Sequence, residues 1–410
     1  MPSQTMPDQK EIEKIREDFP ALKQDPGPVY FDNACTTLKP YFVLEAEREY
    51  EERFTACGER SAHSWGEKTT RLCEETRRKI AKFIGARKPE EIVFVKNATE
   101  GINLVAHSLD FKEGDIVLTS DKEHNSNLLP WLWQAKQKKL KHGIVRSRSD
   151  NTFDLEKFKE ILNREKNIKL VSVVHTSNLD GHTFPVKEII KIAHQKEILV
   201  LLDSTQTVPH QKINIKDLDT DFLVFSGHKM LGPTGIGVLY GKLELLQQLN
   251  SFILGGGTVS NSFYDDYQLL EPPQKFEAGI QNYSGILGLG AAVDYLGKIG
   301  FEKIKKQEES LNSYITEQFK QMPEIKIIGP ADPKERGSIV AFNIKDKNPQ
   351  EVAEILNTSA NIMVRAGQFC VHSWFNGRKI KSAVRASFYF YNTLPEAEIF
   401  VKNIQKIIKL

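Results

Sequence analysis

An aspartate and a lysine each follow an apolar run, and together they could hold an aldehyde cofactor. Asp203 ends the run ILVLLD, and Lys229 lies in FSGHKMLG, 26 residues further along the chain. A buried carboxylate needs a partner, and a protonated ring nitrogen of pyridoxal phosphate (PLP) is one such partner. A lysine amine can form a Schiff base with the aldehyde of PLP. On the residues alone, Asp203 could instead cap the turn DSTQ, and Lys229 could extend into solvent.

Candidate donors for a phosphate lie at two places. Ser226 and His228 share a turn with Lys229, and Ala98 and Thr99 open a predicted helix in KNATEGINLVA. A helix N-terminus favours an anion through its free N–H groups and its dipole. A helix that begins with threonine is common, so this motif alone is a weak signal.

Two further polar residues follow strand-like runs. His124, in SDKEHNSNLLPW, could lie flat over a pyridine ring and move protons, although a lone histidine is more often structural. Asn178 follows the run IKLVSVVHTS and could bond the ring hydroxyl oxygen or a substrate carboxylate. Both residues would serve one pocket if the strands lie side by side.

The C-terminal part contributes two arginines and a cysteine. Arg385, in RASFYFYNT, suits bidentate capture of an amino-acid carboxylate. Cys370, in VRAGQFCVHSW, is either an inert buried thiol or a nucleophile. A free thiol titrates at about 8.5, so a cation such as Arg365, His372 or the substrate would have to hold the thiolate. Cys73 lies on an apolar helical stripe and is predicted to be core.

The elements that position these residues alternate between strand and helix. Strands are predicted at 91–97, 115–120, 168–178, 198–205, 220–229 and 235–241, with helices at 99–109 and 186–196. This pattern predicts an α/β fold with a mainly parallel sheet that helices cover on both faces. Ligands bind beyond the carboxyl ends of strands in such sheets. The candidate residues follow five of these ends, so we expect them to converge.

The pattern changes after about residue 265. Helices at 285–300, 301–321, 348–360 and 395–410 and strands at 325–330, 337–344 and 384–393 predict a smaller α+β unit. We therefore expect an N-terminal segment (1–24) with a helix at about 9–18, a large domain (25–284) and a small C-terminal domain (285–410) that carries the Cys370 loop.

The composition is that of an ordinary globular protein, with 410 residues, 40% apolar, 27% charged and a net charge of +2. The basic run KQKKLKH (136–142) is best explained as a solvated helix face, so no nucleic-acid partner is predicted. No apolar run is long enough for a membrane helix, and the start lacks a secretory signal. The four cysteines lack zinc spacing, so we expect no metal, free thiols and a cytoplasmic location.

Eight motifs carry a resemblance to a known family. They are VYFDNACTTLKP, KNATEGINLVAHSL, EHNSNLLPW, DSTQTVPH, FSGHKMLGPTGIGVLYGK, FEAGIQNYSG, VRAGQFC and RASFYFYNT, and they span about residues 28–395. The sequence resembles the class V, fold-type I PLP-dependent enzymes, and among them the SufS-like type II cysteine desulfurases. The resemblance implies the fold-type I transferase fold, with a seven-stranded-type sheet, and PLP as cofactor.

The resemblance also implies a role for each position. Lys229 would form the Schiff base, Asp203 would pair with the pyridinium, Gln206 would bond the ring hydroxyl and His124 would stack on the ring. Thr99, Ser226 and His228, with the backbone of Ala98, would hold the phosphate. Asn178, Arg385 and Arg365 would face the substrate. Cys370 would take sulfur from L-cysteine as a persulfide and pass it to an acceptor protein, with release of alanine, in a homodimer.

The chain departs from the family pattern at several positions. Ala98 lacks a hydroxyl that the family often has, and Ile280 replaces a threonine that commonly reaches the neighbouring subunit's phosphate. Cys35 replaces an alanine near the pocket entrance. These changes leave open the sulfur acceptor, which could serve iron–sulfur cluster assembly, tRNA thiolation or another cofactor.

Other functions compete with the cysteine desulfurase reading. Another class V PLP reaction, such as selenocysteine lyase, epimerase or aminotransferase activity, can run without a nucleophilic thiol, so Cys370 argues for sulfur transfer. A non-catalytic scaffold is disfavoured, because Lys229, Asp203 and Cys370 are all present.

Overall fold

The computed structural model describes residues 9–410. The expectations for the N-terminal segment and the missing secretory signal rest partly on residues 1–8, which lie outside the described residues. Within the described part of the chain, no helix is long and apolar enough to span a bilayer.

A seven-stranded sheet forms the centre of the molecule, in the order β2-β8-β7-β6-β5-β3-β4. The strands are β2 (Ile92–Val95), β3 (Ile116–Ser120), β4 (Lys141–Val145), β5 (Ile168–Val174), β6 (Leu199–Asp203), β7 (Phe222–Ser226) and β8 (Gly237–Gly241). Strand β8 runs antiparallel to both of its neighbours, β2 and β7, and the other neighbouring pairs of this sheet are parallel. The predicted mainly parallel sheet is confirmed.

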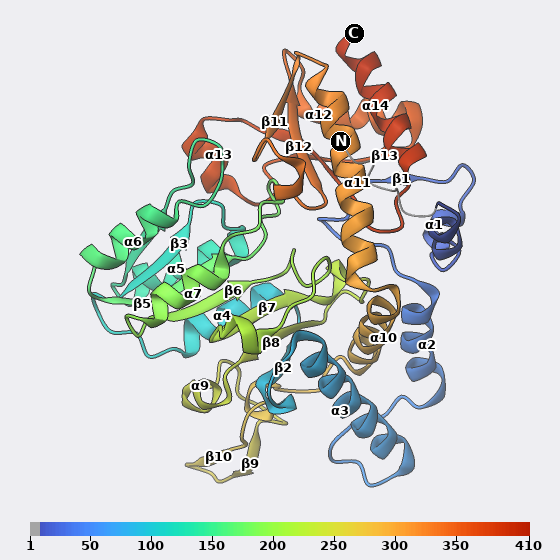
Figure 1. The fold of residues 1–410 in the computed structure, drawn as a ribbon. Helices are drawn as coiled ribbons and strands as arrows, with labels where there is room; N and C mark the ends of the chain where they lie inside the picture. The colour runs from blue at the N-terminus through green and yellow to red at the C-terminus, as the bar shows by residue number, and fades with distance from the viewer. Residues whose placement is uncertain (1–8) are drawn as a thin grey trace.

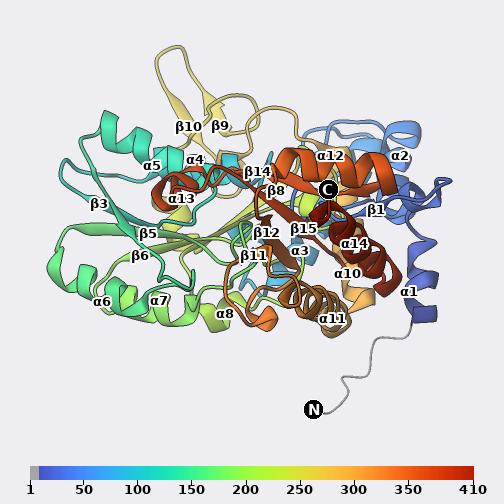
Figure 2. The ribbon, with the colours of Figure 1, turned by 90° about the horizontal axis from the view of Figure 1, so that it is seen from above.

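Helices cover both faces of this sheet, as expected for strands that are buried on both sides (Figure 1). Seen from above in Figure 2, α4 (Ala98–Ser108) and α5 (Asn125–Gln137) lie on one face, and α6 (Leu155–Arg164) and α7 (Val186–His194) lie on the other. Short helices α8 (Ile215–Leu218) and α9 (Leu243–Gln248) precede β7 and follow β8. The bundle of α2 (Tyr41–Arg53), α3 (Ser64–Ile84) and α10 (Tyr283–Ile299) packs beside the sheet.

The C-terminal part forms a four-stranded antiparallel sheet with its own apolar core. Its strands, in sheet order, are β11 (Ile325–Ile328), β12 (Ile339–Ile344), β15 (Ala383–Ser387) and β14 (Arg365–Gly367). The helices of this part are α11 (Phe301–Lys320), α12 (Pro349–Ala360), α13 (His372–Arg378) and α14 (Leu394–Ile408). The four-stranded sheet faces the carboxyl ends of the strands of the large sheet. It therefore forms the second wall of the cavity that lies between the two sheets.

The segment 29–37 lies between the two sheets, although it comes early in the chain. Strand β1 (Val29–Tyr30) pairs with β13 (Ile362–Met363), and Asp32 forms a bridge with Ser387. The Ala34 N–H donates to Ser387 Oγ at 2.9 Å. The backbone N–H of Thr37 donates to the carbonyl of His228, which follows β7 of the large sheet, at 3.0 Å. This segment therefore joins both halves of the site.

The N-terminal helix packs against the C-terminal part. Helix α1 (Gln9–Arg16) corresponds to the helix predicted at 9–18. Arg16 forms an ion pair of 2.9 Å with Glu396 of α14. Lys303 of α11 forms a second ion pair, with Glu11.

Two local predictions differ from the structure, and one element was missed. The basic run 136–142 is not one helix face, because α5 ends at Gln137 and β4 begins at Lys141, where it forms the edge of the sheet. The strand predicted at 384–393 ends at Ser387, and the aromatic residues after it form a buried turn. The hairpin of β9 (Val259–Ser262) and β10 (Tyr267–Leu269), which projects from the body in Figures 1 and 2, was not predicted.

Candidate active site

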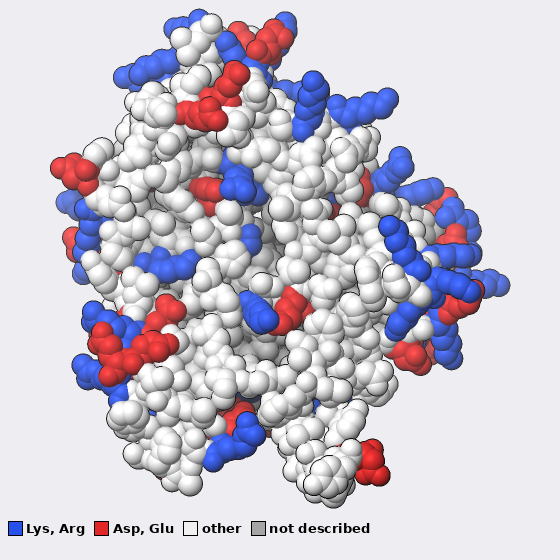
Figure 3. Space-filling view, turned by 180° about the vertical axis from the view of Figure 1, so that it is seen from behind, with Lys and Arg blue, Asp and Glu red and all other residues white. Residues whose placement is uncertain are grey.

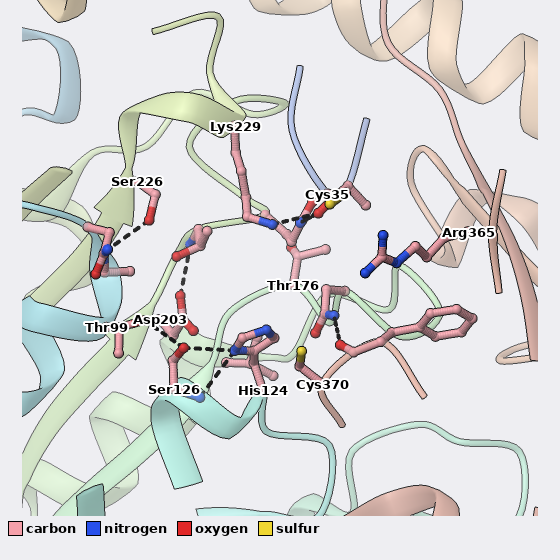
Figure 4. Close-up of a pocket in the computed structure, with 18 of the residues that line it drawn as sticks. Cys35, Thr99, His124, Ser126, Thr176, Asp203, Ser226, Lys229, Arg365 and Cys370 are labelled. Atoms are coloured by element: carbon pink, nitrogen blue, oxygen red, sulfur yellow. Dashed lines mark hydrogen bonds between the residues drawn. The ribbon is translucent and has the colours of Figure 1, made fainter. Parts of the chain in front are cut away.

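One cavity of about 440 Å³ lies where the carboxyl ends of the large sheet meet the C-terminal sheet (Figure 4). All twelve predicted site residues line it: Ala98, Thr99, His124, Asn178, Asp203, Gln206, Ser226, His228, Lys229, Arg365, Cys370 and Arg385. They come from the ends of five strands of the large sheet and from the C-terminal sheet. The fold thus brings together side chains that are up to 287 positions apart in sequence, from Ala98 to Arg385.

Lys229 ends the single 3-10 turn that follows β7, and its amine is held inside the cavity. Its Nζ donates to the carbonyl of Ala34 at 2.6 Å, and Gln206 Nε2 donates to the same carbonyl at 2.8 Å. Burial, together with the charge of the nearby Arg385, lowers the pKa of Lys229 to about 8. A larger share of the amine is therefore neutral near pH 8, as a nucleophile requires.

Asp203 ends β6 and is buried at the floor of the cavity. Burial raises the pKa of its carboxyl, and hydrogen bonds from Thr205 and the charge of Lys229 partly offset this rise. Its Oδ1 accepts the N–H of Thr205 at 3.1 Å. A cation placed in the cavity would restore the charged carboxylate, so Asp203 suits a protonated ring nitrogen.

Donors gather at the start of α4. The side chain of Asn97 caps the helix by accepting the N–H of Glu100 at 3.0 Å. The N–H of Ala98 donates to Ser226 Oγ at 2.9 Å, which leaves the Ser226 hydroxyl hydrogen for another acceptor. Among the described residues that line the cavity, Asp203 is the only carboxylate. The start of α4 is therefore the part of the cavity best suited to an anion.

His124 is a neutral imidazole with a defined tautomer. Its Nδ1 accepts the backbone N–H of Ser126 at 3.1 Å. Because a backbone N–H can only donate, Nδ1 carries no proton and the ring proton lies on Nε2. Burial, together with the charges of Lys229, Arg385 and His372, lowers the pKa of His124 to about 4. His124 thus offers one N–H donor and no charge at neutral pH.

Cys370 lies exposed on a tight turn at the rim of the cavity. Phe369 and Cys370 both adopt left-handed backbone angles, with φ of 52° and 58°, which cost energy for residues other than glycine. Two hydrogen bonds hold this turn: Asn125 N–H donates to Cys370 O at 2.7 Å, and Asn178 Nδ2 donates to Phe369 O at 2.8 Å. Residues that follow strands of the large sheet therefore position the thiol of the C-terminal part.

Arg385 is a buried guanidinium with a free donor. It contacts Asn178 O at 2.8 Å and Asp32 at 3.4 Å, while its buried Nε has no partner among the described residues. Burial lowers the pKa of Arg385, and Asp32 partly offsets this. A carboxylate would satisfy the unpaired N–H. Arg365, exposed at the start of β14, adds a second guanidinium.

Several lining residues were not predicted as site residues. Ser126 and Thr176 add two hydroxyls to the cavity. Cys35, which was expected near the pocket entrance, and His372, which was considered as a cation beside Cys370, also line it. Ser126 could have been noticed as the second residue after His124 in a polar run. No pattern in the sequence marks Thr176 as a residue of the cavity. Ile280, in contrast, is 67% exposed and is not among the lining residues.

The residues present fit PLP. A buried lysine and a buried carboxylate share one cavity with a helix N-terminus that offers N–H and hydroxyl donors. The unpaired Nε of Arg385 provides, in addition, a place for the carboxylate of an amino acid. Among the described residues, no group of His, Cys, Asp or Glu side chains has the arrangement of a metal site.

Comparisons with known proteins agree with this reading. Residues 29–400 match the model of the aminotransferase class-V family. A probable cysteine desulfurase of Synechocystis sp. is 40% identical over 403 residues, which cover 96% of this chain and 95% of that protein. A cysteine desulfurase of Serratia proteamaculans is 37% identical, over 97% of this chain and 98% of that protein.

Solved structures are similar over nearly the whole chain. The apo structure of a cysteine desulfurase from Thermococcus onnurineus is 39% identical, with a TM-score of 0.92 over 97% of this chain and 98% of that one. The Escherichia coli cysteine desulfurase CsdA, in an S-sulfonic acid form, is 29% identical, with a TM-score of 0.89 over 97% of this chain and 98% of that one.

Proposed function

This chain belongs to the aminotransferase class-V family and is a PLP-dependent cysteine desulfurase, and we propose that the cavity around Lys229 is where it converts L-cysteine to L-alanine. The observation that carries this assignment is the convergence of Lys229, Asp203 and Cys370 on one cavity. A lysine, an acid and a thiol in one place provide cofactor attachment, cofactor activation and sulfur capture.

The residues that would hold PLP follow from their surroundings. Lys229 would attach the aldehyde, Asp203 would accept from the ring nitrogen and His124 would face the ring. Ser226, His228 and Thr99, with the backbone of Ala98, would hold the phosphate, and Gln206 would bond the ring hydroxyl. When bound, PLP supplies an electron sink for the bonds at the substrate Cα and Cβ.

The protein's own groups then complete the reaction. Arg385 and Arg365, with Asn178, orient the substrate carboxylate, and Lys229 moves the proton at Cα. The thiolate of Cys370 attacks the substrate sulfur, so that an S–S bond forms as the Cβ–S bond breaks and its electron pair stays with carbon. Protonation of that carbon gives alanine, and Cys370 keeps the sulfur as a persulfide. A thiol, either a reductant or an acceptor protein, then removes it.

A direct assay tests this function. We expect the purified protein to form alanine and sulfide from L-cysteine in equal amounts when a thiol reductant is present. Alanine is measured by chromatography, and sulfide by methylene-blue formation. Product from L-selenocysteine but none from L-cysteine would identify a selenocysteine lyase instead. Neither product from either substrate would refute sulfur or selenium transfer.

We further propose that the protein works as a homodimer. Apolar side chains on and near the β9–β10 hairpin are exposed, including Phe263, Tyr264, Tyr267 and Ile280. Such a patch on a projecting hairpin is typical of an interaction surface. Seen from behind in Figure 3, charged side chains gather towards the edges of the face, and the hairpin projects at the lower right with few charges.

The oligomeric state can be measured by light scattering after gel filtration. We expect a mass of twice the 46.7 kDa of one chain. Tyr264→Asp should shift the population towards monomer, because it buries a charge in the interface. Lys305→Asp, on the exposed face of α11, is the matched control and should remain dimeric. A monomeric wild type, or a dimeric Tyr264→Asp variant, would argue against this surface.

A further inference from the structure

Phe369 lies between the guanidinium of Arg385 and the turn that presents Cys370. Phe369 lines the cavity and is buried, and the Cζ atom of Arg385 lies 4.7 Å from the centre of its ring. Cys370 is the next residue along the chain, and Figure 4 shows its thiol directed into the cavity. The mechanism above gives the phenyl ring no task.

Two hydrogen bonds and this ring contact connect three residues in a closed triangle. Arg385 Nη1 donates to the backbone carbonyl of Asn178 at 2.8 Å, and Asn178 Nδ2 donates to the backbone carbonyl of Phe369 at 2.8 Å. Because a carbonyl oxygen can only accept, the side-chain amide of Asn178 must face Phe369 with its nitrogen. The contact of the ring with the guanidinium is the third side. A shift of Arg385 therefore reaches the residue before Cys370 by two routes.

The ring contact leaves Arg385 able to bind a ligand. An aromatic ring attracts a cation through its π-electrons and has no oxygen or nitrogen that accepts a hydrogen bond. The buried Nε of Arg385 has no partner among the described residues, so a carboxylate in the cavity can pair with it. The ring thus restricts where the guanidinium lies without occupying this donor.

The turn that carries the thiol is held in a conformation that costs energy. Phe369 and Cys370 have φ angles of 52° and 58°, and a left-handed backbone is rare for a residue as bulky as phenylalanine. Such a conformation persists where neighbouring contacts hold it. The ring of Phe369 makes two of these contacts, one with Arg385 and one with Phe375, whose ring centre lies 5.7 Å away. The position of the thiol therefore depends on the ring as well as on the backbone hydrogen bonds.

We propose that Phe369 is a positioning residue that couples capture of the substrate carboxylate by Arg385 to the placement of the Cys370 thiol. A carboxylate that pairs with Nε fixes the guanidinium, the ring of Phe369 packs against the fixed cation, and the turn then holds the thiol in one position. This inference rests on the proposed role of Arg385. Its effect belongs to substrate affinity and thiol placement, and cofactor attachment should be unaffected.

Two ligands of the PLP-loaded protein separate a carboxylate effect from a general one. L-Alanine and ethylamine both carry an amine on a two-carbon unit, and only L-alanine carries a carboxylate. Wild type and Phe369→Leu are titrated with each ligand, and binding is followed by the change in the visible absorbance of the cofactor. We expect Phe369→Leu, which stays apolar but lacks the aromatic ring, to weaken L-alanine binding about tenfold and to leave ethylamine binding unchanged. Phe369→Tyr, which keeps the ring, should bind both ligands as the wild type does.

The reactivity of Cys370 tests the second half of the coupling. Alkylation by iodoacetamide is measured by mass spectrometry of the peptide that contains Cys370, with each ligand at the same occupancy. In the wild type, L-alanine should slow alkylation more than ethylamine does, because only a carboxylate fixes Arg385. In Phe369→Leu, the two ligands should slow it equally.

Phe375→Leu is the matched control for lost packing. It is the same substitution in the same apolar cluster, at a fully buried residue that does not line the cavity. This variant should lower the melting temperature as Phe369→Leu does and should bind L-alanine as the wild type does.

Four results would overturn the proposal. They are unchanged L-alanine affinity in Phe369→Leu, equal losses for L-alanine and ethylamine, an equal loss of L-alanine affinity in Phe375→Leu, and a difference between the ligands in Cys370 alkylation that persists in Phe369→Leu. A wild type that binds L-alanine no better than ethylamine would instead refute the proposed carboxylate site at Arg385.

Discussion

Replacing Lys229 by alanine is expected to abolish the yellow colour of the attached cofactor and to lower alanine formation about a thousandfold or more. Among the described residues that line the cavity, Lys229 is the only lysine, so no other amine is placed to attach the aldehyde or to move the proton at Cα. Absorbance after gel filtration measures attachment, and alanine formation measures turnover.

Two further variants separate the roles of charge and amine. Lys229→Arg keeps a cation in the cavity, but a guanidinium stays protonated and cannot act as the nucleophile, so this variant should be as inactive as Lys229→Ala. Lys96→Ala, whose side chain is 76% exposed and lies outside the cavity, should behave like wild type. A Lys229→Ala protein that remains coloured and active would refute the proposed attachment site.

The lowered pKa of Lys229 also sets a pH dependence. The neutral amine is the attacking form, and its fraction rises as the pH increases through the pKa of about 8. The rate at which the apo protein attaches PLP should therefore rise up to about pH 8 and then level off. A lysine with its ordinary pKa of 10.5 would give a rate that continues to rise through pH 9 and 10.

Replacing Cys370 by alanine is expected to lower sulfide formation from L-cysteine about a hundredfold or more while the cofactor stays attached. The thiol is exposed at the rim and is held there by the bonds from Asn125 and Asn178, so its loss should leave Lys229 and its surroundings intact. Unchanged visible absorbance would show that the variant is folded and loaded.

Mass spectrometry identifies the sulfur carrier directly. After incubation of the wild type with L-cysteine and no reductant, the peptide that contains Cys370 should gain one sulfur atom. Cys57→Ala, an exposed thiol outside the cavity, is the matched control and should stay active. Cys35→Ala tests the second thiol in the cavity. Added sulfur on the Cys35 peptide, with none on that of Cys370, would reassign the nucleophile.

The sequence was sufficient to predict the large sheet and the residues that gather at its ends. Apolar runs such as ILVLLD and FLVFS are strong signals for buried parallel strands, and the polar residue after each run lies at the same edge for geometric reasons. Cys73 was likewise predicted to be core from its place on an apolar stripe. It is buried, and burial raises its pKa to about 12.

Features that no run or alternation of apolar residues marks in the sequence were not predicted. Strand β4 is an edge strand whose sequence KHGIV begins with charged and polar residues, so it resembled a helix surface. The two strands of the β9–β10 hairpin are short and almost wholly exposed, so no alternation of buried and exposed residues marks them. The backbone carbonyl of Ala34 accepts hydrogen bonds from Lys229 and Gln206. Because every residue has a backbone carbonyl, no residue type in the sequence marks this contact. Contacts of this kind depend on the tertiary arrangement.

The placement of segment 29–37 has a consequence for how the protein is made. Ala34 reaches Lys229 across 195 positions and Ser387 across 353. The ribosome therefore releases one wall of the cavity early and the strand that closes it almost last. Such distant contacts form slowly, because the closure of a long loop costs entropy before the contact compensates for it. A nascent chain thus carries every residue proposed to hold the cofactor well before it gains Arg385 and the support that Ser387 gives to Ala34, both of which arrive with β15.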